Sequence, residues 1–154
     1  MGLTYGLRSV RELFAKLQRD AKLLDEEVTS DRLFNFVLTG YSMIDWVRND
    51  PSISKPAKSE TEIDSLYADY WLKICGDLAT ASKHFKLTKR QPITRSATSS
   101  QGYSVGRYGK GGYGVGEEAI QIELDDGARY DVLEFVNGVV EAWKGFFYRH
   151  QIFC

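Results

Sequence analysis

One of the two histidines in this 154-residue chain, His84, lies among charged residues on a predicted helix. In the stretch "DLATASKHF", Asp77 precedes His84 by seven residues, which places both side chains on roughly the same helical face. A histidine in such a position can act as a general acid or base near neutral pH, while Lys83 stabilises charge that develops on a phosphate. Near a helix end it also has a structural use, because its cationic form complements the helix dipole. Asp77, Lys83 and His84 are therefore a catalytic prediction with a structural alternative.

Other residue types that carry chemistry are sparse. Two histidines are too few for a histidine-based metal site, and the adjacent acids of "LDDGA", Asp125 and Asp126, are typical of a turn between strands. A mixed carboxylate site stays open as an alternative. Cys75 follows Trp71 by one helical turn, which is typical of a small buried residue, and no residue lies in a nucleophile motif. We therefore predict no metal site and no cofactor.

Residues 102–116, "GYSVGRYGKGGYGVG", consist of three five-residue units and contain half of the 14 glycines. Part of this Gly/Tyr tract, "GKGGYG", matches the G-x-G-x-x-G pattern of phosphate-binding loops. A dinucleotide-binding loop must follow a buried strand and open a helix, whereas here a polar stretch precedes and a predicted strand follows. Kinase and Walker loops do not fit either, because their partner motifs are missing. The tract therefore does not predict a nucleotide cradle.

The same tract interleaves cations with aromatic rings. Arg107 and Lys110 alternate with Tyr103, Tyr108 and Tyr113. Proteins bind single-stranded nucleic acid with such combinations of residues, because the cations contact phosphates while the aromatic rings stack on bases. A glycine-rich surface loop without a binding role explains the same composition, and a protein partner is a third interpretation. These five residues are thus candidate nucleic-acid contacts.

Charge is unevenly distributed along the chain, although the net charge is only −1. Residues 78–116 contain no Asp or Glu, so all 21 carboxylates lie elsewhere, together with 13 of the 20 basic residues. This asymmetry predicts a local surface that faces anions, with RNA or another polyanion as the partner, although a solvated linker has the same composition. The basic residues of the segment are Lys83, Lys86, Lys89, Arg90, Arg95, Arg107 and Lys110.

Hydrophobic periodicity predicts four helices, over residues 9–28, 30–49, 60–85 and 132–151. Three of them begin with a capping box, in which a Ser or Asp is followed three residues later by Glu. The third helix carries an apolar stripe from Ile63 to Phe85, and burying each large aromatic ring contributes on the order of 1.5–3 kcal/mol. We therefore expect this helix to lie centrally in the fold.

Between the third and fourth predicted helices the apolar period changes from helical to alternating. Residues 86–117 form a predicted loop, in which "TKRQPITRSATSSQ" suits an edge strand or an extended arm. Residues 118–131 alternate around an Asp126–Gly127 turn and predict a β-hairpin. The expected fold is mainly α (α+β) and a single domain over 1–154. It is a four-helix bundle with a small antiparallel β-hairpin inserted between helices three and four.

The chain has no features of membrane insertion or secretion. No stretch of about 18 apolar residues occurs. The N-terminal "MGLTYGLRSVRELF" has neither the apolar centre nor the cleavage site of a secretory signal, and two cysteines make no disulfide framework. We expect a cytoplasmic protein without a membrane partner.

Four segments follow one another within residues 70–145, which are "DLATASKHFKL", a basic loop, "IQIELDDGARYDVLEF" and a last helix with "VVEAW". In the order of these segments, residues 70–145 resemble small bacterial proteins of the HEPN-like group. The resemblance implies a helical bundle, association with toxin or antiphage systems, homodimerisation and, in many members, metal-independent ribonuclease activity. HEPN ribonucleases carry an arginine four to six residues before a histidine on one helix. Neither His84 nor His150 has that arginine, and Lys144 lacks its planar fork.

The sequence leaves three functions open. The first is a small interaction module that binds RNA or another polyanion through residues 83–110, in a toxin or phage-conflict setting. The second is a ribonuclease that uses His84 with Lys83 and needs no divalent metal. The third is a protein-binding regulator that binds no nucleic acid. The missing arginine favours binding over cleavage.

Overall fold

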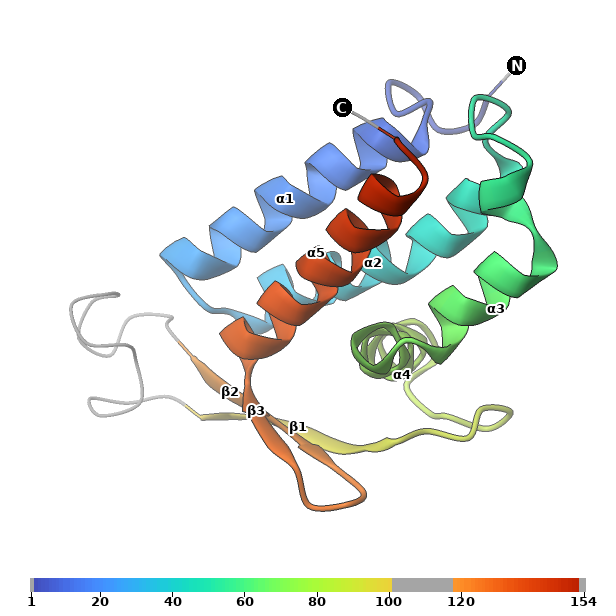
Figure 1. The fold of residues 1–154 in the computed structure, drawn as a ribbon. Helices are drawn as coiled ribbons and strands as arrows, with labels where there is room; N and C mark the ends of the chain where they lie inside the picture. Colours follow the sequence, from blue (N-terminus) through green and yellow to red (C-terminus); the bar gives the residue numbers. More distant parts are fainter. Residues whose placement is uncertain (1, 101–117, 153–154) are drawn as a thin grey trace.

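Figure 1 shows the computed structural model, which describes residues 2–100 and 118–152. A mainly helical α+β fold with a small antiparallel sheet is confirmed. None of the described helices is both long and apolar enough to cross a bilayer. The helices are α1 (Val10–Glu26), α2 (Ser30–Asn49), the short 3₁₀ helix η1 (Pro56–Lys58), α3 (Glu60–Ala68), α4 (Tyr70–His84) and α5 (Val132–Arg149). The strands are β1 (Thr94–Ser100), β2 (Ala119–Leu124) and β3 (Arg129–Asp131).

The helix predicted over 60–85 is wrong as a single element, because Asp69 separates α3 from α4. The Asp69 backbone is extended (φ −60°, ψ 134°), and its carboxylate accepts the N–H groups of Trp71 and Leu72 at 3.0 and 3.1 Å. An aspartate that caps the amides of a first turn starts a new helix. The apolar stripe continues through the break since both helices bury residues in the same core. The described residues therefore form five α-helices where four were expected.

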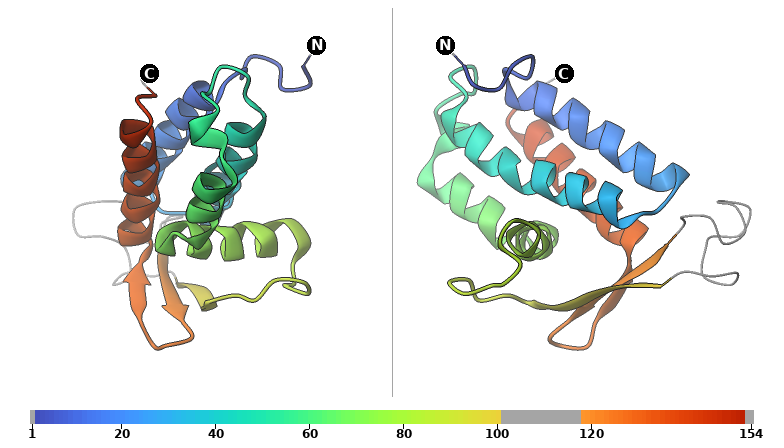
Figure 2. Two further views of the ribbon diagram at one scale, coloured as in Figure 1. Left: turned by 45° about the vertical axis from the view of Figure 1, so that its right-hand side comes forward. Right: turned by 180° about the vertical axis from the view of Figure 1, so that it is seen from behind.

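Helix α1 packs against α2 and α5, and α4 packs against α2 and α5 close to the sheet, which lies at one end of the molecule (Figures 1 and 2). Large aromatic side chains fill the centre, and Trp143 and Phe36 are among those fully buried. The Trp143 indole Nε1 donates to the backbone oxygen of Gly40 at 3.1 Å, so its polar atom is satisfied inside the core. Burial of apolar surface is the main favourable term that holds these helices together.

The sheet has the strand order β1-β2-β3, and both pairs are antiparallel. The predicted hairpin is confirmed as β2 and β3, whose turn contains Gly127 at φ 92°, a left-handed conformation that favours glycine. The polar stretch expected as an edge strand or an extended arm is the edge strand β1. It pairs with β2 from Thr94↔Leu124 to Ser100↔Ala119.

A buried ion pair holds the start of β1 against α4. Asp77 is only 2% exposed, and Arg90 Nε donates a hydrogen bond to its Oδ1 at 2.5 Å. Asp77 Oδ2 accepts the backbone N–H groups of Ile93 and Thr94, both at 3.0 Å. Arg90 also donates to the Tyr41 hydroxyl at 2.9 Å and to a backbone carbonyl of α4 at 3.0 Å. Because a buried carboxylate needs its acceptor sites filled, these bonds determine where β1 begins.

Gly76 lets this ion pair lie close to α4. A Cβ atom at this position would be 2.5 Å from Cε1 of the Tyr41 ring and 2.6 Å from Nη2 of Arg90. Any larger residue would push the guanidinium away from Asp77. A glycine costs up to about 1 kcal/mol inside a helix relative to alanine, so its presence here is explained by the close approach of the two side chains.

Asp77→Ala is expected to lower the free energy of unfolding by about 3–5 kcal/mol. The change leaves the partly buried Arg90 without its counter-charge and two backbone N–H groups without acceptors. Asp64→Ala, which removes an exposed acid from α3, is the matched control and should change the same quantity by no more than about 0.5 kcal/mol. Urea unfolding followed by tryptophan fluorescence measures both. Equal stability of the two variants would contradict the structural role of Asp77.

Candidate functional site

An apolar groove of about 340 Å³ lies between α2, α4 and the first two strands, and we name it the α2–α4 groove. Leu33, Phe34 and Val37 line it from α2, and Ala81 and Phe85 line it from α4. Side chains of β1 and β2 form the third side, and three serine residues are included in the lining. A mostly apolar hollow with a few polar groups is the usual form of a binding surface.

The groove exists because small side chains lie where the helices leave the sheet uncovered. Ala97 and Ser99 of β1 pair with the buried residues Ile122 and Ile120, so they lie on the face of the sheet that meets the helices. Both are nevertheless exposed, and Ala81 on the helical side adds little bulk. A leucine at any of these three positions would fill part of the groove.

Two phenylalanine rings on opposite walls of the groove are exposed to solvent. Phe34 is 47% exposed, and Phe85 is 88% exposed, so the expectation that Phe85 belongs to a buried stripe is wrong. Phe85 ends α4 with φ 69°, and its N–H donates to the backbone oxygen of Ala81 at 2.7 Å. Glycine is the usual residue in this left-handed conformation, and another residue there costs of order 1–3 kcal/mol. Sequence periodicity did not reveal this surface, since it assigns large apolar residues to the core.

Four basic residues lie at the end of α4 and in the loop that follows it, and we name them the α4 tip: Lys83, His84, Lys86 and Lys89. All four side chains are exposed, and none forms a hydrogen bond or ion pair with another described residue. Lys83 and His84 lie in the last turn of α4, where a positive charge is favoured by the helix dipole. The tip adjoins the groove along the chain, because Phe85 lies between His84 and Lys86.

Two other cations of the predicted anion-facing surface are engaged within the protein. Arg90 pairs with the buried Asp77. Arg95 Nη1 lies 3.7 Å from a carboxylate oxygen of Glu123, and its Nη2 donates to the backbone oxygen of Asp125 at 3.1 Å. Of the five predicted cations that lie in the described part of the chain, only Lys83, Lys86 and Lys89 therefore have no ion-pair partner among the described residues.

The predicted catalytic residues Asp77, Lys83 and His84 all lie on α4, but no described bond joins them. The Asp77 oxygens accept from Arg90 and two backbone N–H groups, which is a structural role. His84 is exposed and lies seven residues further along the helix, about 10 Å along its axis. Among the described residues, His84 has no carboxylate partner that would orient its ring.

The Gly/Tyr tract, residues 102–116, lies outside the part of the chain that the structure describes. The predicted contacts Tyr103, Arg107, Tyr108, Lys110 and Tyr113 lie outside the described residues, so they stay predictions.

Cys75 is buried as expected from its position on the helix. Its thiol donates to the backbone oxygen of Val37 at 3.5 Å, and burial raises the pKa of this thiol, so it stays protonated at neutral pH. Across residues 2–100 and 118–152, no group of three or more His, Cys, Asp or Glu residues is placed to hold a metal ion.

Glu118 borders the groove through hydrogen bonds that sequence reasoning missed. The Ser30 N–H and hydroxyl donate to its two carboxylate oxygens at 2.8 and 2.5 Å, and the Ser99 hydroxyl donates to one of them. Its own N–H donates to the backbone oxygen of Val28 at 2.9 Å. Burial acts to raise the pKa of Glu118, but the hydrogen bonds from Ser30 and Ser99 outweigh it, so the pKa is lowered. Glu118 thus ties the sheet to the corner between α1 and α2.

Comparison of the chain with protein-family models, curated proteins and solved structures returned no match. The HEPN-like resemblance therefore stays a prediction from the sequence. The function has to be inferred from the α2–α4 groove, the α4 tip and the chemistry of their side chains.

Phe85→Gly is expected to leave the free energy of unfolding unchanged or to raise it by up to about 2 kcal/mol. Glycine relieves a strain of order 1–3 kcal/mol, which exceeds the roughly 0.5–1 kcal/mol that its greater freedom in the unfolded chain costs. The exposed ring loses little burial. Phe36→Ala, at a fully buried ring, should cost about 3–5 kcal/mol in the same urea titration. A loss of that size for Phe85→Gly would show that the ring packs in the core.

Glu118 makes stability depend on pH in a defined direction. Its pKa in the folded protein lies below the usual value of 4.5, so its stabilising contribution is present above that pH and is lost as pH falls through the folded pKa. Glu118→Gln should therefore flatten the decline of the thermal midpoint between about pH 5 and pH 3. Glu26→Gln, at an exposed acid of α1, should leave that decline as in the wild type. Circular dichroism melting measures both, and two parallel declines would argue against the assigned hydrogen bonds.

Proposed function

We propose that the protein is a small binding module for single-stranded RNA, or for another polyanion in its place, and that the α4 tip is its contact surface. The observation that carries this proposal is a set of three exposed lysines without a carboxylate partner among the described residues, next to an exposed aromatic ring. Lys83, Lys86 and Lys89 supply the charge, and Phe85 supplies the ring. An ammonium group binds a phosphate oxygen as a point charge.

The exposed ring of Phe85 favours RNA with unpaired bases over a compact anion. A base that stacks on an aromatic side chain contributes about 1–3 kcal/mol, and only unpaired bases are free to do so. Lys83, Lys86 and Lys89 lie two, one and four residues from Phe85 along the chain, so they are within reach of the phosphates that flank the stacked base. A surface of this kind binds with little sequence preference, because every base has an aromatic face.

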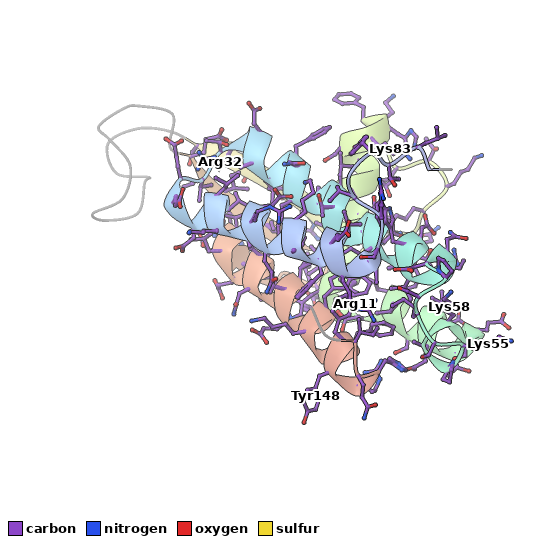
Figure 3. The ribbon with its side chains drawn as sticks, turned by 90° about the horizontal axis from the view of Figure 1, so that it is seen from above. Arg11, Arg32, Lys55, Lys58, Lys83 and Tyr148 are labelled. Atoms are coloured by element: carbon purple, nitrogen blue, oxygen red, sulfur yellow. The ribbon has the colours of Figure 1, made fainter. Side chains whose placement is uncertain are left out.

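The distribution of charge supports contact at the α4 tip rather than elsewhere. Figure 3 shows Lys83 at one edge of the molecule, apart from Lys55 and Lys58. Outside residues 78–116 the chain carries 21 acidic and 13 basic residues, so the rest of the surface has an excess of negative charge. Such a field repels a polyanion from the body of the protein and directs it toward the local cations.

Binding without cleavage is the better supported form of this function. His84 lies at the α4 tip, but Asp77 is engaged with Arg90 and cannot orient the His84 ring at the same time. A general base needs a defined position relative to the proton that it removes. The sequence also lacks an arginine four to six residues before His84, the pattern of the ribonucleases that the chain resembles.

The double variant Lys83→Glu/Lys86→Glu is expected to weaken binding of a fluorescent single-stranded RNA by about tenfold or more. Three phosphate contacts predict a slope of about −2 for the logarithm of affinity against the logarithm of salt concentration, and one remaining lysine predicts about −0.7. Lys55→Glu/Lys58→Glu changes the net charge equally and is the matched control, which should keep the wild-type affinity. Fluorescence anisotropy at several salt concentrations measures all three proteins.

Each alternative has its own outcome in this experiment. Equal losses in both double variants would mean that net charge alone matters and that the α4 tip is not the contact surface. RNA that is recovered shortened without added metal, and intact with His84→Ala, would identify a ribonuclease instead. No binding to RNA, to single-stranded DNA or to polyphosphate would contradict the proposed function.

A further inference from the structure

We infer that β1 and the α2–α4 groove together form a docking site for an extended segment of another protein. The segment adds to the free edge of β1 as a fourth strand and places alternate apolar side chains in the groove. This inference goes beyond the proposed function, because the ligand is a polypeptide and its main contacts are a strand edge and an apolar hollow rather than the lysines.

The first observation is the free edge of β1. Among the described strands its one neighbour is β2, so its other edge presents N–H and C=O groups outside the described ladder. Natural edge strands are usually protected against pairing by charge, proline or an irregular register. In β1 such features are confined to the start, at Arg95 and the register shift between Thr94 and Ser96. The remaining residues, Ser96–Ser100, are uncharged and lack proline.

The second observation is the position of the groove relative to that edge. Ala97 and Ser99 point to the helix-facing side of the sheet, where the groove lies. An added strand continues the pleat about 4.8 Å further out, so alternate side chains of it point to the same side. In Figures 1 and 2, β1 runs beneath α4 and α2 with no other described element along its outer edge. The alternate side chains of the added strand then meet Phe34 and Phe85.

These two observations define the chemistry of the occupant. The free edge requires an extended peptide backbone, because a ladder needs N–H donors as well as acceptors, and a nucleic-acid backbone has no such pattern. The apolar walls require apolar residues at every second position. Charge complementarity with Lys83 and Lys86, which flank the groove residue Phe85, requires a carboxylate at the end of the segment nearest α4.

The probe is a set of synthetic peptides that match β1 in length, with valine alternating with threonine and a glutamate at one end. A peptide of the same composition without the alternation is the reference. We expect the alternating peptide to bind at least about tenfold more tightly than the reference, measured by fluorescence anisotropy. Hydrogen exchange at the backbone amides of 96–100 should slow in its presence, because an added strand provides acceptors for amides at the outer edge.

Two neighbouring residues of β1 provide a matched pair of variants. Ala97 and Thr98 are both exposed, but their partners in β2 are the buried Ile122 and the exposed Gln121, so they lie on opposite faces of the sheet. Ala97→Glu places a charge in the groove and should weaken peptide binding about tenfold or more, whereas Thr98→Glu should change it less than about threefold. Thermal melting confirms that both variants fold.

The outcomes separate this inference from the proposed function. RNA affinity at the α4 tip should be the same in Ala97→Glu and Thr98→Glu, because both add one negative charge to the same strand. No preference for the alternating peptide, equal losses in the two variants, or peptide binding without protection of 96–100 would each overturn the docking site and leave RNA binding unaffected. Loss of RNA binding in Ala97→Glu alone would show that the groove binds RNA, which would also overturn the inference.

Discussion

The ion pair between Asp77 and Arg90 is the interaction on which the arrangement of the sheet and the groove depends. The buried Asp77 carboxylate accepts one hydrogen bond from the Arg90 guanidinium, in the loop after α4. It accepts two more from backbone N–H groups at the start of β1. Arg90, Ile93 and Thr94 lie 13, 16 and 17 residues after Asp77, so the loop must fold back under α4 to reach it. A buried charge without these partners would cost several kcal/mol, so the backbone has little freedom to place β1 elsewhere. Gly76 supplies the space in which the pair fits.

The groove depends on the position in which this ion pair holds β1. The strand begins beneath α4 and runs on toward the start of α2, and its second half forms one side of the groove between these two helices. Small residues of β1 and α4 leave the space open there, and Glu118 holds the far end of the strands to the corner between α1 and α2. Phe85 keeps a large ring exposed in a backbone conformation that glycine usually adopts. Strain at an exposed residue is common at functional surfaces, which fits a binding role for this side of the molecule.

Much of the fold could be predicted from the sequence, but the candidate site could only partly be predicted. Helix positions and the hairpin follow from apolar periodicity and capping residues, which act within a few residues of each other. The break at Asp69 lay inside a continuous stripe, so periodicity hid it. The excess of basic residues in 78–116 was correctly recognised as a feature of composition, yet composition does not distinguish an exposed Lys86 from an Arg90 that is paired internally. Asp77 likewise has the spacing of a catalytic residue and the environment of a structural one.

The sequence by itself determined that this chain is mainly helical with a small hairpin, because local hydrogen bonding and the burial of one face leave a periodic pattern in the residues. Only the tertiary structure decided which charges are free and where the surface is hollow. Those properties depend on contacts such as that of Ser30 with Glu118, which lie 88 residues apart. The free energy of burying a charge or exposing a ring depends on the neighbouring groups that the fold places around it. The order of residues along the chain does not show which groups those are.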